Sequence, residues 1–243
     1  MKNIHPFVRK TLAWSVHLFT ATGVIWGFLS LRAIITHEWK LAIMYMTVAL
    51  IVDGTDGIFA RWFDVKTYAN GLNGTLLDSI IDYLNTTVVP ALFLVEANLL
   101  PKNLGVPCAV LILITSTYQF TQIDAKTDAT NEYFFKGFPV FWDIVTVFMM
   151  VLRLDQWFNF GLLIVLNILI FVPIKYVYPT RTARLKKLTL TITYLYGLLG
   201  LIGVLLYPNE PKWIWWVILT YFIYYVSLSL WLYNHPTTLN EAK

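Results

Sequence analysis

The chain has 243 residues, of which 58% are hydrophobic and only 13% are charged, and its mean hydropathy is +0.63. Soluble domains carry about 25% charged residues, so this composition excludes an ordinary soluble protein. The formal net charge of +4 is too small to indicate a nucleic-acid partner, and a single cysteine, Cys108, excludes an internal disulfide.

Apolar stretches long enough to cross a hydrocarbon core of about 30 Å recur along the whole chain. They predict eight membrane-spanning helices, at residues 14–34, 39–60, 75–97, 105–122, 138–153, 157–176, 188–206 and 213–233. The fifth is short, so it is expected to be tilted or partly buried. The predicted fold class is an all-α integral membrane protein, a polytopic helical bundle.

This pattern also predicts the division of the chain. Residues 1–13 would be a cytoplasmic juxtamembrane segment, residues 14–234 one transmembrane domain, and residues 235–243 a cytoplasmic tail. The first apolar stretch is too long for a cleavable signal peptide. Residues 3–12 mix basic and apolar side chains, which fits either a short helix on the inner leaflet or a frayed terminus.

The distribution of Lys and Arg predicts the orientation. With the N-terminus inside, thirteen of these residues fall in inner segments and five in outer segments. Because inner loops carry the excess of positive charge, this arrangement is favoured. The end of the second span and the start of the third then face the cytosol.

Four aspartates stand at those two ends, where carboxylates are costly. Asp53 and Asp56 lie late in the second span, and Asp78 and Asp82 lie early in the third. An ionised Asp inside a membrane helix costs about 2.5–3.5 kcal/mol, so four of them require compensating cations. Spacings of three and four residues put each pair on one helix face, which lets all four converge. Carboxylate oxygens suit Mg²⁺, Mn²⁺ or Ca²⁺, so the pattern predicts a metal site.

Small residues and one cation accompany the aspartates. Gly57 and Ala60 follow Asp56, Arg61 comes next, and Gly74 lies one turn before Asp78. Small residues allow a flat ligand to approach closely, and arginine suits phosphate oxygens, so the group fits a pyrophosphate-bearing nucleotide. The alternative is that the small residues only allow helices to cross.

The pattern Asp-Gly-x-x-Ala-Arg, then Gly-x-x-x-Asp-x-x-x-Asp, resembles the signature of the CDP-alcohol phosphotransferases, integral membrane enzymes that release CMP from a CDP-linked donor. Asp53 supplies the further Asp that precedes the Asp-Gly pair. The resemblance implies two divalent cations, Mn²⁺ or Mg²⁺, and a homodimer. It implies metal ligands at Asp53, Asp56, Asp78 and Asp82, a catalytic base at Asp82, and donor binding by Gly57, Ala60, Arg61 and Gly74. Twelve residues separate Arg61 from Gly74, where most members have about eight.

Other segments resemble the bacterial phosphatidylcholine synthases within that family. They are residues 17–21, 122–127, 134–143 and 176–181. The resemblance implies an enzyme of the bacterial inner membrane that transfers the phosphatidyl group from CDP-diacylglycerol to choline, with its active site facing the cytosol. Tyr133 and Asp143 depart from the pattern, in which a His and an Asn are usual.

Aromatic residues around the fifth span offer a site for choline, since a quaternary ammonium is held by aromatic faces. The candidates are Glu132, Tyr133, Phe134, Phe138 and Trp142. The alternative is an interfacial aromatic belt, in which case the search for the acceptor site would begin at His17, Thr20 and Asn85. Likewise, Lys175 and Arg181 either bind donor phosphate oxygens or only set the topology. Other functions left open are transfer to serine or inositol and, in a different class, cation transport.

Overall fold

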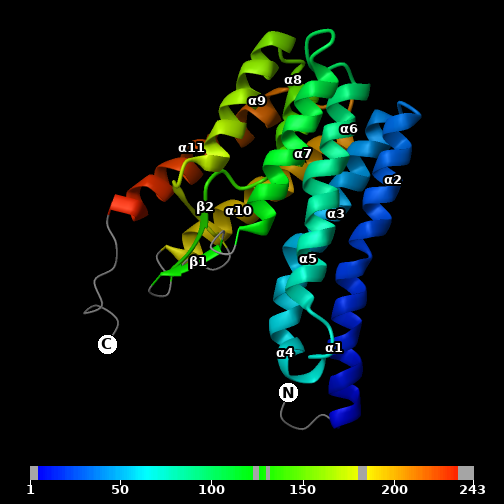
Figure 1. Ribbon diagram of the computed structural model, residues 1–243, viewed down its shortest axis with the longest axis vertical. Coiled ribbons are helices and arrows are strands. Elements are labelled where there is room, and N and C mark those ends of the chain that lie inside the picture. Colours follow the sequence, from blue (N-terminus) through cyan, green and yellow to red (C-terminus); the bar gives the residue numbers. More distant parts are fainter. Residues whose placement is uncertain (1–4, 123–125, 130–131, 180–184, 235–243) are drawn as a thin grey trace.

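The computed structural model describes residues 5–122, 126–129, 132–179 and 185–234. Helices dominate this part of the chain (Figure 1). They are α1 (Pro6–Ala21), α2 (Gly23–Ile35), α3 (Trp39–Trp62), α4 (Val65–Tyr68), α5 (Gly74–Tyr83), η1 (Leu84–Val88), α6 (Val89–Glu96), α7 (Gly105–Thr121), α8 (Trp142–Leu152), α9 (Gln156–Phe171), α10 (Lys186–Leu206) and α11 (Trp213–Asn234).

Five helical segments of the described chain are long and apolar enough to cross a membrane. They are Pro6–Ile35, Trp39–Trp62, Gly74–Glu96, Lys186–Leu206 and Trp213–Asn234. Three of the predicted spans are shorter apolar helices, α7, α8 and α9. A helical segment therefore stands at each predicted span, and the protein is a polytopic helical membrane protein.

The first helix begins before the predicted first span, at Pro6. The imidazole Nδ1 of His5 accepts the backbone N–H of Phe7 at 3.3 Å and so caps α1. Proline at the first helical position favours this start, because its missing N–H would have no partner there. Residues 6–12 thus continue α1 as one helix, and the helix breaks only at Thr22, before α2.

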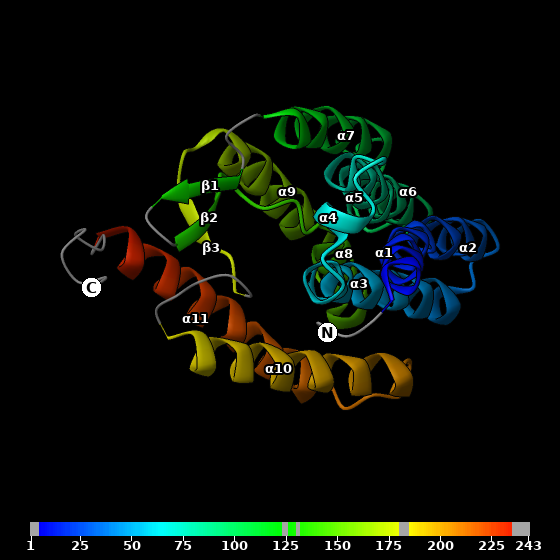
Figure 2. The same ribbon diagram turned by 90° about the horizontal axis from the view of Figure 1, so that it is seen from below.

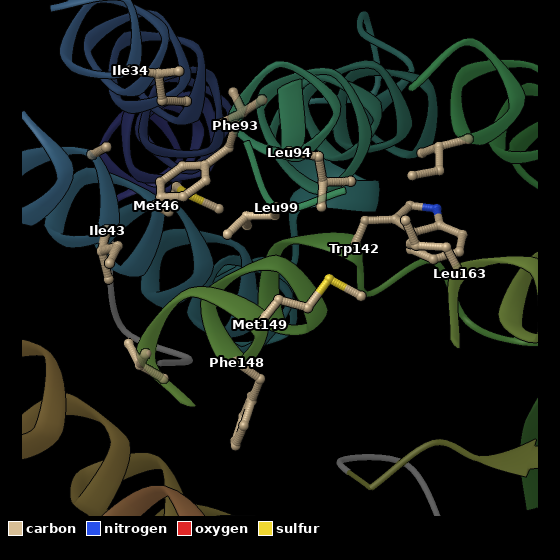
Figure 3. Close-up of a cluster of buried hydrophobic side chains, with 14 of the residues drawn as sticks. Ile34, Ile43, Met46, Phe93, Leu94, Leu99, Trp142, Phe148, Met149 and Leu163 are labelled. Carbon is tan, nitrogen blue, oxygen red and sulfur yellow. The ribbon is translucent and has the colours of Figure 1, made fainter. Parts of the chain in front are cut away.

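The main core lies where α2, α3, α6, α8 and α9 meet (Figure 3). Phe93, Leu94, Trp142 and Met149 are almost completely buried in it. Inside a membrane, close packing rather than escape from water holds helices together, so these interlocked side chains fix the bundle. Seen from below, α8 lies in the middle of the molecule, with the α10–α11 pair on one side of it (Figure 2).

A small antiparallel sheet interrupts the helical architecture, and it was not predicted. Its strands β1 (Lys126–Ala129), β2 (Glu132–Lys136) and β3 (Lys175–Val177) follow the order β1-β2-β3. The predicted spans 138–153 and 157–176 are shorter as helices because this sheet adjoins both. Gly137 ends β2 with φ of +79°, and a Cβ there would collide with the carbonyl oxygen of Ile170, so glycine is required.

The third span contains one turn of π-helix, η1, directly after α5. The N–H of Val89 donates to the carbonyl oxygen of Leu84, five residues earlier. Pro90 has no N–H to offer, so the ordinary α-helical bond is missing at this point. Single π turns often occur at functional sites, and this one begins two residues after Asp82.

Candidate active site

Three of the four predicted aspartates converge. Ligand oxygens of Asp53, from α3, and of Asp78 and Asp82, from α5, all lie within 4.8 Å of one another. The side chain of Asn73 accepts the N–H of Leu76 at 3.1 Å and starts α5 one turn before Asp78. Asp78 and Asp82 are then one turn apart on α5, and both carboxylates reach that of Asp53. The convergence predicted from the spacing is confirmed for these three.

Asp56 lies apart from this triad but lines the same narrow cavity. The cavity is lined by Thr20, Gly23, Ala49, Val52, Asp53, Asp56, Asp78, Ile81 and Asp82. Asp56 is buried, and its carboxylate accepts a hydrogen bond of 2.9 Å from the hydroxyl of Thr20 on α1. All four aspartates therefore border one space, with α1 closing its side.

The donor set of this cavity fits a hard divalent cation. Three carboxylates this close repel one another, and a cation between them would turn the repulsion into attraction. The three candidate ligands of the triad are all carboxylate oxygens of Asp side chains, and the triad includes no thiol or imidazole. Such a set suits Mg²⁺ or Mn²⁺ better than zinc or copper.

The small residues serve both packing and access. A Cβ on Gly74 would lie 2.9 Å from Cε1 of His17, so this glycine lets α1 pack closely on α5. A Cβ on Gly57 would lie 3.4 Å from Nη1 of Arg61, so the guanidinium lies beside the backbone of Gly57. Ala60 packs against a small cluster formed by Ala13, Val16, Val65 and Ala69. Gly74 and Ala60 thus contribute to helix packing, and Gly57 leaves room for the arginine; donor binding by the three residues stays a prediction.

The long connection between Arg61 and Gly74 folds back against α1. Nη1 of Arg9 donates to the phenolic oxygen of Tyr68 at 2.7 Å, and the guanidinium lies 5.6 Å from the centre of that ring. Nε2 of His17 lies 3.3 Å from the carbonyl oxygen of Ala69. The extra residues therefore tie the first helix to the segment between the two halves of the Asp motif.

The structure separates the predicted choline residues into two groups. The rings of Phe138 and Trp142 lie 5.4 Å apart, and the fully buried Trp142 donates its indole N–H to Ser116 at 2.9 Å. Phe134 packs instead with Tyr176 and Tyr225 in a second cluster. Glu132 and Tyr133 are part of strand β2, but their side chains lie outside the described residues. Choline binding by these residues stays a prediction.

The two predicted donor-binding cations are placed unequally. Lys175 begins β3 and pairs with Lys136 of β2 in the sheet register, which brings two lysines together. Arg181 lies outside the described residues. The roles of both remain predictions.

Two polar residues outside the Asp motif, Thr20 in the wall of the cavity and Asn85 in η1, make contacts that the motif did not predict. Thr20 holds Asp56, and the side-chain amide of Asn85, in η1, donates to the carbonyl oxygen of Gly23 at 3.1 Å. The side-chain oxygen of Asn85 is buried and has no hydrogen-bond partner among the described residues. A sequence signal existed for both, since each is polar within an apolar stretch.

Comparison of the sequence with known proteins identifies the family of this chain. The family model described as CDP-alcohol phosphatidyltransferase matches residues 13–174. The chain is 35% identical to the phosphatidylcholine synthase of Borreliella burgdorferi, over 96% of this chain and 97% of the relative. It is 38% identical to that of Legionella pneumophila, over 93% of this chain and 88% of the relative. A third relative, from Mesorhizobium japonicum, is 38% identical over 82% of this chain and 75% of its own. With the Asp motif intact, the chain belongs to the CDP-alcohol phosphatidyltransferase family.

Proposed function

We propose that this protein transfers the phosphatidyl group of CDP-diacylglycerol to choline, which forms phosphatidylcholine and releases CMP. The observation that carries the proposal is the carboxylate triad of Asp53, Asp78 and Asp82, whose ligand oxygens lie within 4.8 Å of one another. The relatives, named phosphatidylcholine synthases and similar over most of their length, support the choice of reaction.

Asp53, Asp56, Asp78 and Asp82 would hold two divalent cations, Mg²⁺ or Mn²⁺. Bound there, the cations supply positive charge to the pyrophosphate of the donor. The chain itself contributes the positioning: Thr20 fixes the Asp56 carboxylate, and Asn73 fixes the start of α5. Arg61, lying beside Gly57, offers its guanidinium to donor phosphate oxygens. Lys175 and Arg181 are further candidates for the same phosphates.

The acceptor must lose its hydroxyl proton, and Asp82 is the proposed base. It is half-buried at the edge of the cavity, within reach of both Asp53 and Asp78. A base of this kind contributes about 10²–10⁴-fold in rate. The aromatic residues Phe134, Phe138 and Trp142, with Glu132 and Tyr133, would attract the ammonium group.

The proposal extends to the membrane location, the orientation and the oligomeric state of the protein. We propose a bacterial inner-membrane enzyme whose Asp cavity opens to the cytosol, since thirteen of the eighteen Lys and Arg residues fall in the predicted inner segments. A homodimer is part of the proposal because it is implied by the family resemblance. The acyl chains of donor and product would stay in the bilayer while CMP leaves to the cytosol.

One assay tests the reaction and the acceptor together. The purified full chain is given CDP-diacylglycerol, Mg²⁺ or Mn²⁺, and in turn choline, serine, inositol or glycerol phosphate, while CMP release is followed. We expect release with choline to exceed that with each other alcohol, and to stop on addition of a chelator. If CMP were released faster with serine or inositol than with choline, that alcohol would be the acceptor instead of choline. No release with any alcohol, despite correct insertion, would refute the transferase proposal.

A further inference from the structure

A second cavity, which we call the distal cavity, lies at the end of the molecule away from the Asp cluster. Asp53 lies fourteen residues after Trp39 along α3, about 21 Å at about 1.5 Å per residue. Trp39 packs against Phe93 of α6, near the turn that contributes Asn98 and Leu99 to the distal cavity. The two cavities therefore border opposite halves of the bundle.

The distal cavity is large and built from three separate turns. Its volume is about 390 Å³, within the range of small-molecule sites, roughly 300–1,000 Å³. Asn98 comes from the α6–α7 connection, Arg153 from the α8–α9 connection, and Tyr207 and Glu210 from the α10–α11 connection. Its floor is apolar and includes Met149, which belongs to the main core.

Charges of both signs line its rim. Arg153 and Lys212 are exposed cations, and Glu210 is a half-buried acid. One carboxylate oxygen of Glu210 is buried and has no hydrogen-bond partner among the described residues. A buried carboxylate oxygen left in this way costs free energy, so it calls for a positively charged or hydrogen-donating ligand group.

Tyr207 adds a neutral aromatic surface between these charges. Burial raises the pKa of its phenol, the Glu210 carboxylate raises it further, and Arg153 lowers it. The phenol therefore stays uncharged at physiological pH. Tyr207 lines the cavity together with Glu210, so an aromatic ring and a carboxylate can both attract a cation bound there.

Side chains that suit a lipid environment flank the cavity on the same turns. Trp157 and Phe158 follow Gln156 of the rim, and Leu206 and Trp213 flank the α10–α11 connection; all four are exposed. Tryptophan at this position is typical of the boundary between hydrocarbon and head groups. The rim is thus placed at the level where the head group of a neighbouring phospholipid lies.

We propose that the distal cavity binds the head group of a zwitterionic phospholipid, with its phosphate at Arg153 and Lys212 and its ammonium group at Glu210 and Tyr207. Two cations and one anion match a phosphodiester joined to an ammonium by a short spacer. An anionic lipid would meet the cations but leave the Glu210 oxygen without a positive partner. Under the proposed orientation the lipid would belong to the outer leaflet.

The test measures lipid binding to the delipidated full chain in detergent by native mass spectrometry, with phosphatidylcholine, phosphatidylethanolamine and phosphatidylglycerol as probes. We expect a single molecule of a zwitterionic lipid, phosphatidylcholine or phosphatidylethanolamine, to bind at least about tenfold more tightly than phosphatidylglycerol. Arg153→Gln and Lys212→Gln should each weaken it about tenfold, and Glu210→Gln should abolish the preference over phosphatidylglycerol. Lys102→Gln and Glu96→Gln, near the same turns but outside the lining, are the matched controls.

Two further arms separate this lipid from others. Asp78→Asn should retain the lipid that Arg153→Gln loses, which distinguishes it from product bound at the Asp cavity. CMP release by Glu210→Gln should match the unchanged protein. Unaltered lipid binding in all three rim variants would overturn the proposal. If soluble glycerophosphocholine bound with the same affinity as the lipid, the ligand of the distal cavity would be a soluble zwitterion, and the proposal of a lipid would be wrong.

Discussion

The two cavities of this protein differ in sign of charge and in how the chain builds them. The Asp cavity gathers four carboxylates, three of them with oxygens within 4.8 Å, from two helices and a supporting threonine. The distal cavity is rimmed by Arg153, Lys212 and Glu210, each from a turn rather than a helix. Helices hold the groups of the first at a fixed spacing, as transfer chemistry at a metal requires. Turns arrange the second more openly, as suits binding without chemistry.

The sharpest way to break this comparison is to remove one charge from each cavity. Asp78→Asn takes away a carboxylate that the cations need, so we expect CMP release to fall by more than about 10³-fold, to background. Glu210→Gln at the distal cavity should leave release unchanged. CMP release at saturating Mg²⁺ or Mn²⁺ is the measurement, with membrane insertion as the control. Near-normal turnover of Asp78→Asn would refute the metal site.

A second variant divides the Asp cavity itself into binding and chemistry. Asp82→Asn should lower kcat by about 10²–10⁴-fold, because the proposed base is lost. CDP-diacylglycerol binding, followed by titration without choline, should change much less. If donor binding falls as far as kcat does, Asp82 acts as a metal ligand only. Unchanged kcat would place the base on another residue.

The two aromatic groups can be compared in the same way. Phe138→Ala removes a ring that packs on Trp142 at the start of α8, and should raise the KM for choline by roughly thirtyfold, the equivalent of about 2 kcal/mol of cation–π attraction. The KM for CDP-diacylglycerol should stay constant. Phe134→Ala, in the separate cluster with Tyr176, is the partner experiment and should have a smaller effect. Equal choline KM values in both variants and the unchanged protein would identify an interfacial belt.

The smallest expected effect concerns the support of the Asp cavity. Thr20→Val keeps the shape of the side chain but removes the hydroxyl that donates to Asp56 at 2.9 Å. Loss of such a supporting hydrogen bond costs about 10–100-fold in metal affinity or activity, and we expect the lower end. The metal concentration for half-maximal CMP release measures it. Thr20→Ser retains the hydroxyl and should behave normally; a defect as large as that of Thr20→Val would implicate packing instead.

The aspartate convergence was predictable because its information is local. Spacings of three and four residues put Asp53 and Asp56 on one face and Asp78 and Asp82 on another, and membrane insertion penalises such acids unless they meet. Composition likewise predicted the helical membrane fold. The spacing did not distinguish the triad from Asp56, because that depends on Thr20 lying on α1, thirty-six residues away.

Other features were not predictable because they depend on contacts between distant segments. Residues 175 and 176 were predicted to end a membrane span, yet they pair as a strand with residues 135 and 136. Gly137 marks the transition, but its clash partner, the Ile170 carbonyl, is known only from the fold. The distal cavity combines Asn98 with Lys212, more than a hundred residues apart. Its charged residues look like ordinary turn residues in the sequence.

The π turn at Leu84–Val88 uncouples the orientation of two halves of one membrane span. Its extra residue allows α5 to turn Asp82 toward the cavity while α6 turns Phe93 and Leu94 into the core. Each residue of an α-helix advances the side chains by about 100°, so deleting one residue here would misalign the two halves by that angle. Substitutions in α6 can therefore change how it packs in the core without changing the direction in which α5 presents Asp78 and Asp82. The five residues of η1 therefore set the rotation of α6 about the helix axis relative to α5.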